Sequence, residues 1–290
     1  MITPEHEAAR PAGGPGFADA VTFAWGDRDA GLYGLARVGL AAGRGNALAV
    51  LFAEGEPVGA TARGDVEVPA GADFTALDVG EVSTTVVAPL REWTVGFDAG
   101  AARFDLSFAA LGAPAEIDAA EPVAAAGGMV GYEQLCRVTG TVVARGKERA
   151  IECLGQRSHL WGEPDWERID ATRTVAAWLD DGTGFALTAV RPDGARGHDR
   201  DAAWAVLLDA DGSLHVDQPR LSTTYDADGH QRRAGLELWL GEGDHARRAA
   251  GEVLCGSSFD LGPLRLDCAF LRWHMGGREG VGRYDLVRRA

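Results

Sequence analysis

Short runs of alternating apolar and polar residues, separated by glycine-containing turns, dominate the chain. Residues 92–111 alternate on both sides of a glycine turn, so the large apolar side chains of each arm share one face: Trp93, Val95 and Phe97, then Phe104, Leu106 and Phe108. Alternation with period two predicts β-strands that bury one face. Asp-Gly pairs at 181–182, 211–212 and 228–229 separate further runs of this kind, and such pairs are strong hairpin signals. The pattern predicts an all-β protein built from antiparallel hairpins.

One stretch breaks this pattern. Residues 109–129 contain two prolines, several alanines and glycines, and no steady period, which is typical of a connection between domains. We therefore predict two β domains, residues 1–128 and 129–290. Helix is scarce, and residues 243–255 fit one short helix.

Composition and charge narrow the range of functions. The chain has 290 residues, 46% of them hydrophobic, which suffices for one large or two moderate cores. Its net charge of −15 repels phosphate backbones and anionic lipid, so binding to nucleic acid or to a membrane surface is not expected. No apolar run approaches the roughly 20 residues that span a bilayer. The polar N-terminus lacks the features of a secretory signal, so we expect a flexible arm on a cytoplasmic protein.

Motifs for metals and cofactors are missing from the sequence. The four cysteines, Cys136, Cys153, Cys255 and Cys268, form no C-x-x-C pair, and we expect buried free thiols. The seven histidines are scattered, so no metal site is expected. No P-loop, G-x-G-x-x-G or G-x-S-x-G motif opens a helix, and no cofactor is expected. A closed barrel of about eight strands can hold one small ligand, and we expect a small apolar ligand in a mostly apolar cavity.

Polar and aromatic side chains gather in residues 155–166, GQRSHLWGEPDW. This segment holds an arginine, a histidine, two tryptophans and two acids, namely Arg157, His159, Trp161, Trp166, Glu163 and Asp165. About one hairpin upstream, where their strand can pair beside the segment, lie Tyr132, Glu133 and Gln134.

These residue types fit addition of water to an alkene, or its cyclisation. Such chemistry needs a proton donor, a base that activates water and stabilisation of a carbocation. A buried carboxylic acid stays protonated near neutral pH because desolvation disfavours its anion, and aromatic faces attract cations. The candidate catalytic residues are Glu133, His159 and Asp165. The candidate substrate-binding residues are Tyr132, Gln134, Arg157, Trp161, Trp166 and Trp178, with Trp273 from the late run FLRWHMGG.

The main candidates also have structural interpretations. Trp161 fits a core residue, and His159 fits a histidine that ties its loop to the sheet. Arg157 fits a partly buried ion pair with Glu133 or Asp165. Tyr132 and Gln134 could form hydrogen bonds to a ligand or to a turn between the domains.

The run GYEQLCRVTGTV, followed by GQRSHLWGEPDW, resembles the hydroxyneurosporene synthase (carotenoid 1,2-hydratase)/AttH-like superfamily, and more closely an uncharacterised actinobacterial branch of it. That branch carries Tyr-Glu-Gln before a strand, then Gly-x-Arg-Asp-His-Ser-Trp-Gly followed by Arg-Asp-Trp. The matching positions are Tyr132, Glu133, Gln134, Gly155, Arg157, His159, Trp161, Gly162, Asp165 and Trp166. The resemblance covers most of the chain from Trp93 onward and is faint before it.

The resemblance implies two lipocalin-like antiparallel β-barrel or sandwich domains with a ligand cavity at or near their junction. It also implies chemistry on small apolar molecules, because the superfamily includes water addition to isoprenoid double bonds and the same fold serves Diels–Alderases and related cyclases. This chain departs from the pattern at Ser158, where the family has Asp, and at Leu160, where it has Ser. If that Asp is the acid or the partner of His159, another group such as Glu133 or Asp165 must replace it.

Three functions are compatible with these observations. The first is an enzyme that hydrates or cyclises a C=C bond of an isoprenoid-like or polyketide-like molecule with acid assistance. The second is a pericyclase, which needs shape and hydrogen bonds but no strong acid. The third is a non-catalytic protein that binds a hydrophobic ligand. Substrate identity and oligomeric state have no signature in the sequence.

Overall fold

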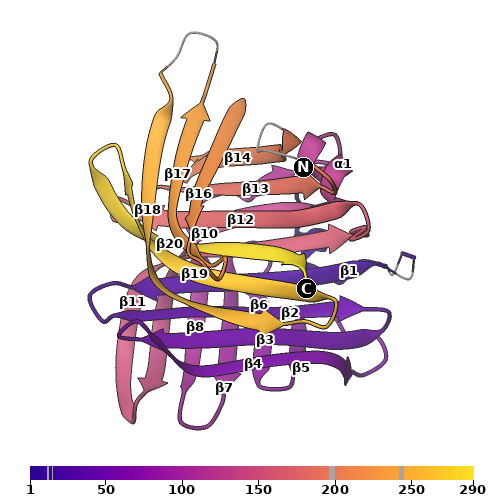
Figure 1. The fold of residues 1–290 in the computed structure, drawn as a ribbon. Coiled ribbons are helices and arrows are strands. Elements are labelled where there is room, and N and C mark those ends of the chain that lie inside the picture. Colours follow the sequence, from indigo (N-terminus) through magenta and orange to yellow (C-terminus); the bar gives the residue numbers. More distant parts are fainter. Residues whose placement is uncertain (12, 15, 196–199, 242–244) are drawn as a thin grey trace. The chain divides into compact units, whose positions relative to one another are not determined.

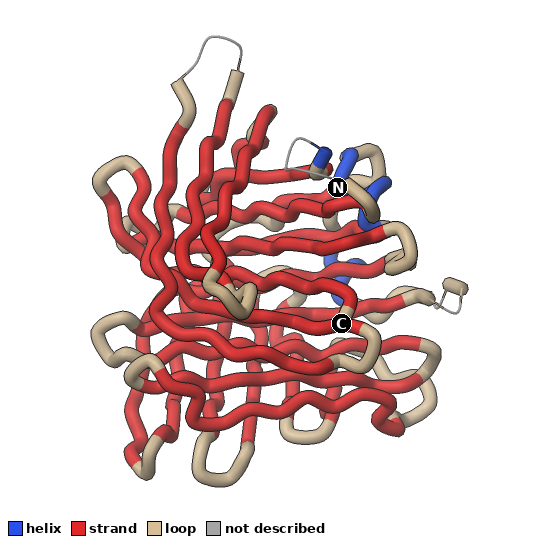
Figure 2. Tube along the Cα trace, in the orientation of Figure 1, coloured by secondary structure: helices blue, strands red, loops and turns tan. Residues whose placement is uncertain are grey.

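The computed structural model describes residues 1–290 except 12, 15, 196–199 and 242–244. Strands, red in Figure 2, make up 68% of the chain and helices 4%, so the prediction of an all-β protein is confirmed. The chain folds into two compact units. The first unit contains Met1–Glu116 and Met129–Pro164, and the second contains Ile117–Gly128 and Asp165–Ala290.

The first unit is an antiparallel sheet of 11 strands in the order β4-β3-β2-β1-β11-β10-β8-β7-β6-β5, with β9 beside β10 (Figure 1). The strands are β1 (Ala18–Asp27), β2 (Leu32–Ala41), β3 (Arg44–Ala53), β4 (Glu56–Glu67), β5 (Ala76–Val79), β6 (Val82–Ala88), β7 (Glu92–Asp98), β8 (Arg103–Ala110), β9 (Ala115–Ile117), β10 (Met129–Ala144) and β11 (Lys147–Gly162). A short 3-10 helix, η1 (Pro4–Glu7), precedes them.

This sheet curls until it nearly closes into a barrel. Thr61 and Arg63 of the edge strand β4 both donate hydrogen bonds to Glu81, in the turn between β5 and β6 at the opposite edge. These two hydrogen bonds, chiefly the one from Arg63, lower the pKa of Glu81 to about 2. The carboxylate therefore stays ionised and links the two edges at neutral pH.

Alternation along the strands fills the interior of the first barrel. Inward side chains form one core that includes Phe23 of β1, Trp93 of β7 and Phe108 of β8. The rings of Phe23 and Phe108 meet edge to face, 5.1 Å between centroids, an arrangement that aromatic quadrupoles favour. Arg145 and Gly146 join β10 to β11 with φ of 52° and 73°. Two positive φ values are what a two-residue type I′ hairpin requires.

The second unit is an antiparallel sheet of nine strands in the order β15-β14-β13-β12-β20-β19-β18-β17-β16 (Figure 1). It contains α1 (Pro122–Gly127), β12 (Ile169–Leu179), β13 (Gly184–Pro192), β14 (Ala202–Asp209), β15 (Gly212–His215), β16 (Gln218–Tyr225), β17 (Gln231–Trp239), β18 (Arg247–Asp260), β19 (Leu264–Met275) and β20 (Arg278–Arg289). The three Asp-Gly pairs lie where the sequence predicts hairpins, after β12, β14 and β16. No helix among the described residues is long and apolar enough to cross a membrane.

The structure differs from the sequence predictions in two places. The compact units do not divide at Gly128, because β10 and β11 belong to the first sheet: β11 pairs with β1 from Gly162 to Leu154. The irregular stretch around residues 109–129 instead marks a crossing to the second unit, where α1 lies against β13 and β14, followed by a return to the first. The helix predicted over residues 243–255 is also wrong. Its described part contains the start of β18, which pairs with β17 and β19.

Candidate functional site

Strand pairing brings five of the predicted residues together in the first unit. In the register of β10 and β11, Tyr132 lies opposite His159 and Gln134 lies opposite Arg157. Trp161 follows on the same face of β11, two residues beyond His159. Cys136 and Val138 continue this face of β10 and belong to the core of the first barrel. The five side chains therefore lie on the inner face of the barrel.

His159 forms the centre of this group. Its side chain is fully buried, and Nε2 lies 2.7 Å from Oδ1 of Asp19. The rings of Trp161, Phe74 and Tyr132 stand edge-on to the imidazole, with centroids 5.1, 5.1 and 5.7 Å away. Burial lowers the pKa of His159 below its ordinary 6.5, against the opposing effect of Asp19, so the ring is neutral at pH 7.

Arg157 forms a second buried polar group beside His159. Its Nη1 donates to the hydroxyl of Tyr132 at 2.7 Å, and its Nη2 forms an ion pair with Glu7. Its guanidinium carbon lies 4.3 Å from the ring centroid of Trp93, close enough for a cation–π interaction. Arg157 thus pairs with Glu7 of the N-terminal segment and not with Glu133 or Asp165, the two partners expected from the sequence.

The N-terminal arm is ordered by this contact, contrary to the expectation of a flexible arm. Glu7 is 4% exposed. Besides Arg157, its carboxylate accepts hydrogen bonds from Nε1 of Trp93 at 3.3 Å and from the backbone N–H of Leu90 at 2.9 Å. The backbone N–H of Arg10 donates to Oδ2 of Asp19 at 2.7 Å. Through these contacts, residues 1–10 lie against the buried polar side chains Arg157 and Asp19 of the first barrel.

Glu133 and Gln134 were both predicted to lie in one site with His159, but their side chains have other partners. Because neighbours in a strand face opposite sides, Glu133 points away from Tyr132 and Gln134. Its carboxylate accepts a hydrogen bond from Nε2 of Gln156 at 2.7 Å. Nε2 of Gln134 donates to the carbonyls of Leu90 at 3.0 Å and of Gly112 at 2.8 Å, and so holds two loops.

Four predicted residues lie in the second unit. Asp165 is exposed, and its Oδ1 accepts the backbone N–H of Glu167 in a turn. Trp166 is half-buried. Trp273 is buried in the core of the second unit. Trp178 is also buried, on the face of β12 opposite the core residue Leu179.

The sequence analysis missed the two carboxylates that contact Arg157 and His159, namely Glu7 and Asp19. Asp19 carried a signal, since it is an acid at an inward position of an otherwise apolar strand, FADAVTFAW. The departure from the family pattern also finds an explanation here. Ser158 and Leu160 lie on the opposite face from His159, so the carboxylate beside His159 comes from β1 and not from the neighbouring position.

The thiols and one acidic group of the described residues are the potential metal ligands outside this site. All four cysteines are free, and burial raises the pKa of Cys136 to about 12, which disfavours the thiolate that binds metals. Asp226, Asp228 and His230 bring ligand atoms within 4.8 Å of one another. Oδ1 of Asp226 accepts the backbone N–H groups of the other two, so the contacts are those of a tight turn.

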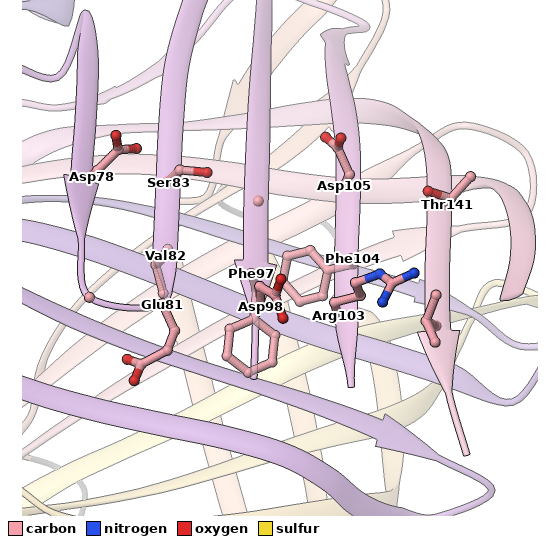
Figure 3. Close-up of a pocket in the computed structure, with 13 residues that line it drawn as sticks. Asp78, Glu81, Val82, Ser83, Phe97, Asp98, Arg103, Phe104, Asp105 and Thr141 are labelled. Carbon is pink, nitrogen blue, oxygen red and sulfur yellow. The ribbon is translucent and has the colours of Figure 1, made fainter. Parts of the chain in front are cut away.

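A hollow of about 940 Å³ lies on the outer face of the first sheet (Figure 3). Asp78, Ser83, Gly96, Asp105 and Thr141 stand in one row across β5, β6, β7, β8 and β10. Oγ of Ser83 occupies the space that a side chain at Gly96 would take, since a Cβ atom there would lie 2.5 Å from it. Its lining mixes charged and polar side chains with Val82, Phe97 and Phe104 and contains none of the predicted site residues, so it does not match the mostly apolar cavity expected from the sequence.

Comparison with known proteins identifies a family and a fold. The family described as "Domain of unknown function (DUF7064)" matches residues 3–288, and no curated protein matches the chain. The structure of an AttH protein (NE1406) from Nitrosomonas europaea has a TM-score of 0.69 at 14% identity, covering 93% of this chain and 91% of that one. Kievitone hydratase from Nectria haematococca has a TM-score of 0.68 at 11% identity, covering 99% and 93%. CghA with Sch210972 has a TM-score of 0.65 at 14% identity, covering 95% and 89%.

These likenesses show that the chain shares the lipocalin-like fold of these proteins, as the resemblance implied. Membership of the AttH-like superfamily itself stays a prediction. The closer resemblance to carotenoid hydratases and to an actinobacterial branch stays a prediction.

Proposed function

The chain belongs to the DUF7064 family of domains of unknown function, and we propose that it is an enzyme that hydrates or cyclises a C=C bond of a small, largely apolar molecule. The observation that supports this most is the buried pair of His159 and Asp19, 2.7 Å apart and surrounded by aromatic rings. A hydratase is also among the proteins that share the fold.

The proposed roles follow from protonation states. His159, held neutral by burial, takes a proton from the attacking water or from the substrate and, as the imidazolium, returns it to the other carbon of the C=C bond. Asp19 orients the imidazole and stabilises the imidazolium that forms. Burial raises the pKa of Tyr132, so its hydroxyl keeps its proton, and Arg157 is a permanent cation. These two donors would hydrogen-bond to an oxygen of the substrate, and the ring of Trp161 would face developing positive charge.

The carboxylate role is assigned to Asp19 and not to Glu133 or Asp165. Asp19 shares the inner face of the first barrel with His159, whereas Glu133 faces the other side of β10. An isoprenoid-like or polyketide-like substrate fits the aromatic surroundings, and an oxygen close to the double bond fits the two donors.

The test uses His159→Asn and mass spectrometry of a metabolite extract from the producing cells, incubated in ¹⁸O-labelled water. The wild type should convert one compound into a product heavier by one labelled water for hydration, or of equal mass and different retention for cyclisation. His159→Asn should lower the rate by about 100-fold, the contribution typical of a general base. His274→Asn is the matched control, because His274 is half-exposed in the second unit. Unchanged turnover in His159→Asn would instead favour a pericyclase, and no turnover in either protein would favour a binding protein.

A further inference from the structure

The N-terminal segment places a carboxylate in a preformed cradle. Nη2 of Arg157, Nε1 of Trp93 and the backbone N–H of Leu90 all point to the two oxygens of Glu7. The hydroxyl of Tyr132 supports Arg157 from the other side. We propose that this cradle (Arg157, Tyr132, Trp93 and the N–H of Leu90) is a receptor for the carboxylate of an apolar acid, and that Glu7 occupies it until such a ligand displaces the segment.

The cradle requires an anion. The Arg157 side chain is 1% exposed, and the guanidinium lies 4.3 Å from the Trp93 ring centroid and 5.2 Å from that of Tyr132. A buried cation without a partner is strongly unfavourable, so any group that replaces Glu7 must carry negative charge. The surrounding rings favour an apolar remainder of the ligand.

Glu7 leaves part of this cradle unused. Nε of Arg157 is buried and makes no hydrogen bond to any described residue, and the same holds for Nδ1 of His159 and Oε1 of Gln134. Arginine binds a carboxylate best through two parallel hydrogen bonds from one edge of its fork. Glu7 takes Nη2 without Nε. A free carboxylate can take both, which gives a ligand contacts that Glu7 does not make.

No strand pairing holds the segment that carries Glu7. Residues 1–10 are all described, and none belongs to a strand. Beyond Glu7, the backbone N–H groups of Ala9 and Arg10 donate to Asp73 at 3.2 Å and to Asp19 at 2.7 Å. The terminal amine pairs with Glu116 at the surface. Release of the segment therefore breaks no ladder hydrogen bond.

Two glycines after the segment can act as a hinge. Gly13 and Gly14 follow the segment, and glycine permits large backbone rotation. The N–H of Gly14 donates to Glu163, so the chain can pivot before this point while β1 stays in place. Arg10 covers the Trp161 ring at 4.6 Å and occupies Oδ2 of Asp19. Displacement of Glu7 would thus uncover the acid–base pair as well.

The first experiment compares octanoate with octanamide on the wild-type protein. We expect octanoate to bind in calorimetry and to increase hydrogen exchange at the amides of Ala9 and Arg10, and octanamide to do neither. The net charge of −15 disfavours non-specific binding of an anion, so a preference for octanoate reports the cradle. Equal binding of the two probes, or octanoate binding with residues 1–10 still protected, would overturn the proposal.

The second experiment removes the competitor. Glu7→Gln should bind octanoate about tenfold more tightly than the wild type, because the open state no longer competes with an internal anion. Glu5→Gln, an exposed neighbour on the same segment, should bind like the wild type. Arg157→Gln should abolish binding. If that variant does not fold, Glu7→Ala serves instead: acetate should raise its Tm and acetamide should not.

Whether the bound acid is also a substrate rests on the proposed function, whereas these experiments measure binding without turnover. A protein that binds octanoate in the cradle but converts nothing would refute the enzyme and leave the receptor. A protein that converts a substrate but binds octanoate no better than octanamide would refute the receptor and leave the enzyme.

Discussion

Both units bury an arginine on the inner face of their sheet, but the two arginines pair with carboxylates of different origin. Arg157 of β11 pairs with Glu7, 150 residues away along the chain, and Arg173 of β12 pairs with Asp201, 28 residues away. Both arginine side chains are at most 2% exposed. Asp201 also accepts a hydrogen bond from Nε of Arg191 at 3.1 Å.

The difference separates a structural ion pair from an exchangeable one. Asp201 directly precedes β14, whose first residue Ala202 pairs with Val190 of β13. Its carboxylate cannot leave Arg173 without loosening that ladder. Glu7 belongs to a segment that the sheet does not hold. The same chemistry therefore stabilises the second unit, whereas in the first unit it leaves a site that another anion can enter.

Loss of the anion in the second unit should have the largest effect. Asp201→Asn removes the carboxylate that accepts hydrogen bonds from both Arg173 and Arg191, and we expect the free energy of unfolding to fall by about 3–5 kcal/mol. Urea unfolding measures this. Asp193→Asn is the control in the same unit, because its pair with Arg289 is about half-exposed and should contribute less than about 0.5 kcal/mol. Similar losses in the two variants would remove the distinction between a buried and a surface pair.

Loss of the anion in the first unit should cost less. In Glu7→Gln the N-terminal segment can detach and admit water to Arg157, so we expect a loss of about 1–3 kcal/mol in the free energy of unfolding. Hydrogen exchange at the amides of Ala9 and Arg10 should rise in the native protein. Glu5→Gln should change neither quantity. A loss as large as that of Asp201→Asn, with the segment still protected, would mean that Glu7 is as structural as its counterpart.

Local pattern predicted much of the fold. The alternation of residues 92–111 identified β7 and β8 and the faces that they bury, and the spacing of one hairpin placed Tyr132 beside His159. The same alternation places Glu133 on the face of β10 opposite to Tyr132 and Gln134. The sequence analysis grouped the three residues by type and did not apply it.

Non-local contacts account for what the sequence did not predict. Asp19 reaches His159 only because β1 pairs with β11, 140 residues later. Glu7 reaches Arg157 from an irregular segment that has no periodicity. The acid in the apolar strand β1 marks Asp19, but its partner follows only from the pairing of β1 with β11. The contact of Glu7 has no local pattern, because its segment belongs to no strand.

The smallest effect should come from His159, a fully buried histidine, in contrast to the half-exposed His274 of the second unit. Burial lowers its folded pKa below the ordinary 6.5, so below about pH 6.5 the unfolded chain binds a proton that the folded chain does not. Its contribution to the free energy of unfolding is complete above that pH and falls by up to about 1.4 kcal/mol per pH unit below it, until the folded pKa is reached. His159→Asn cannot titrate, so the difference in unfolding free energy between wild type and variant should shrink between about pH 7.5 and 5.5 in urea titrations. His274→Asn should keep the wild-type slope. A difference that instead grows as the pH falls would show that His159 is charged in the folded protein and acts as an ion-pair partner of Asp19 instead of a neutral base.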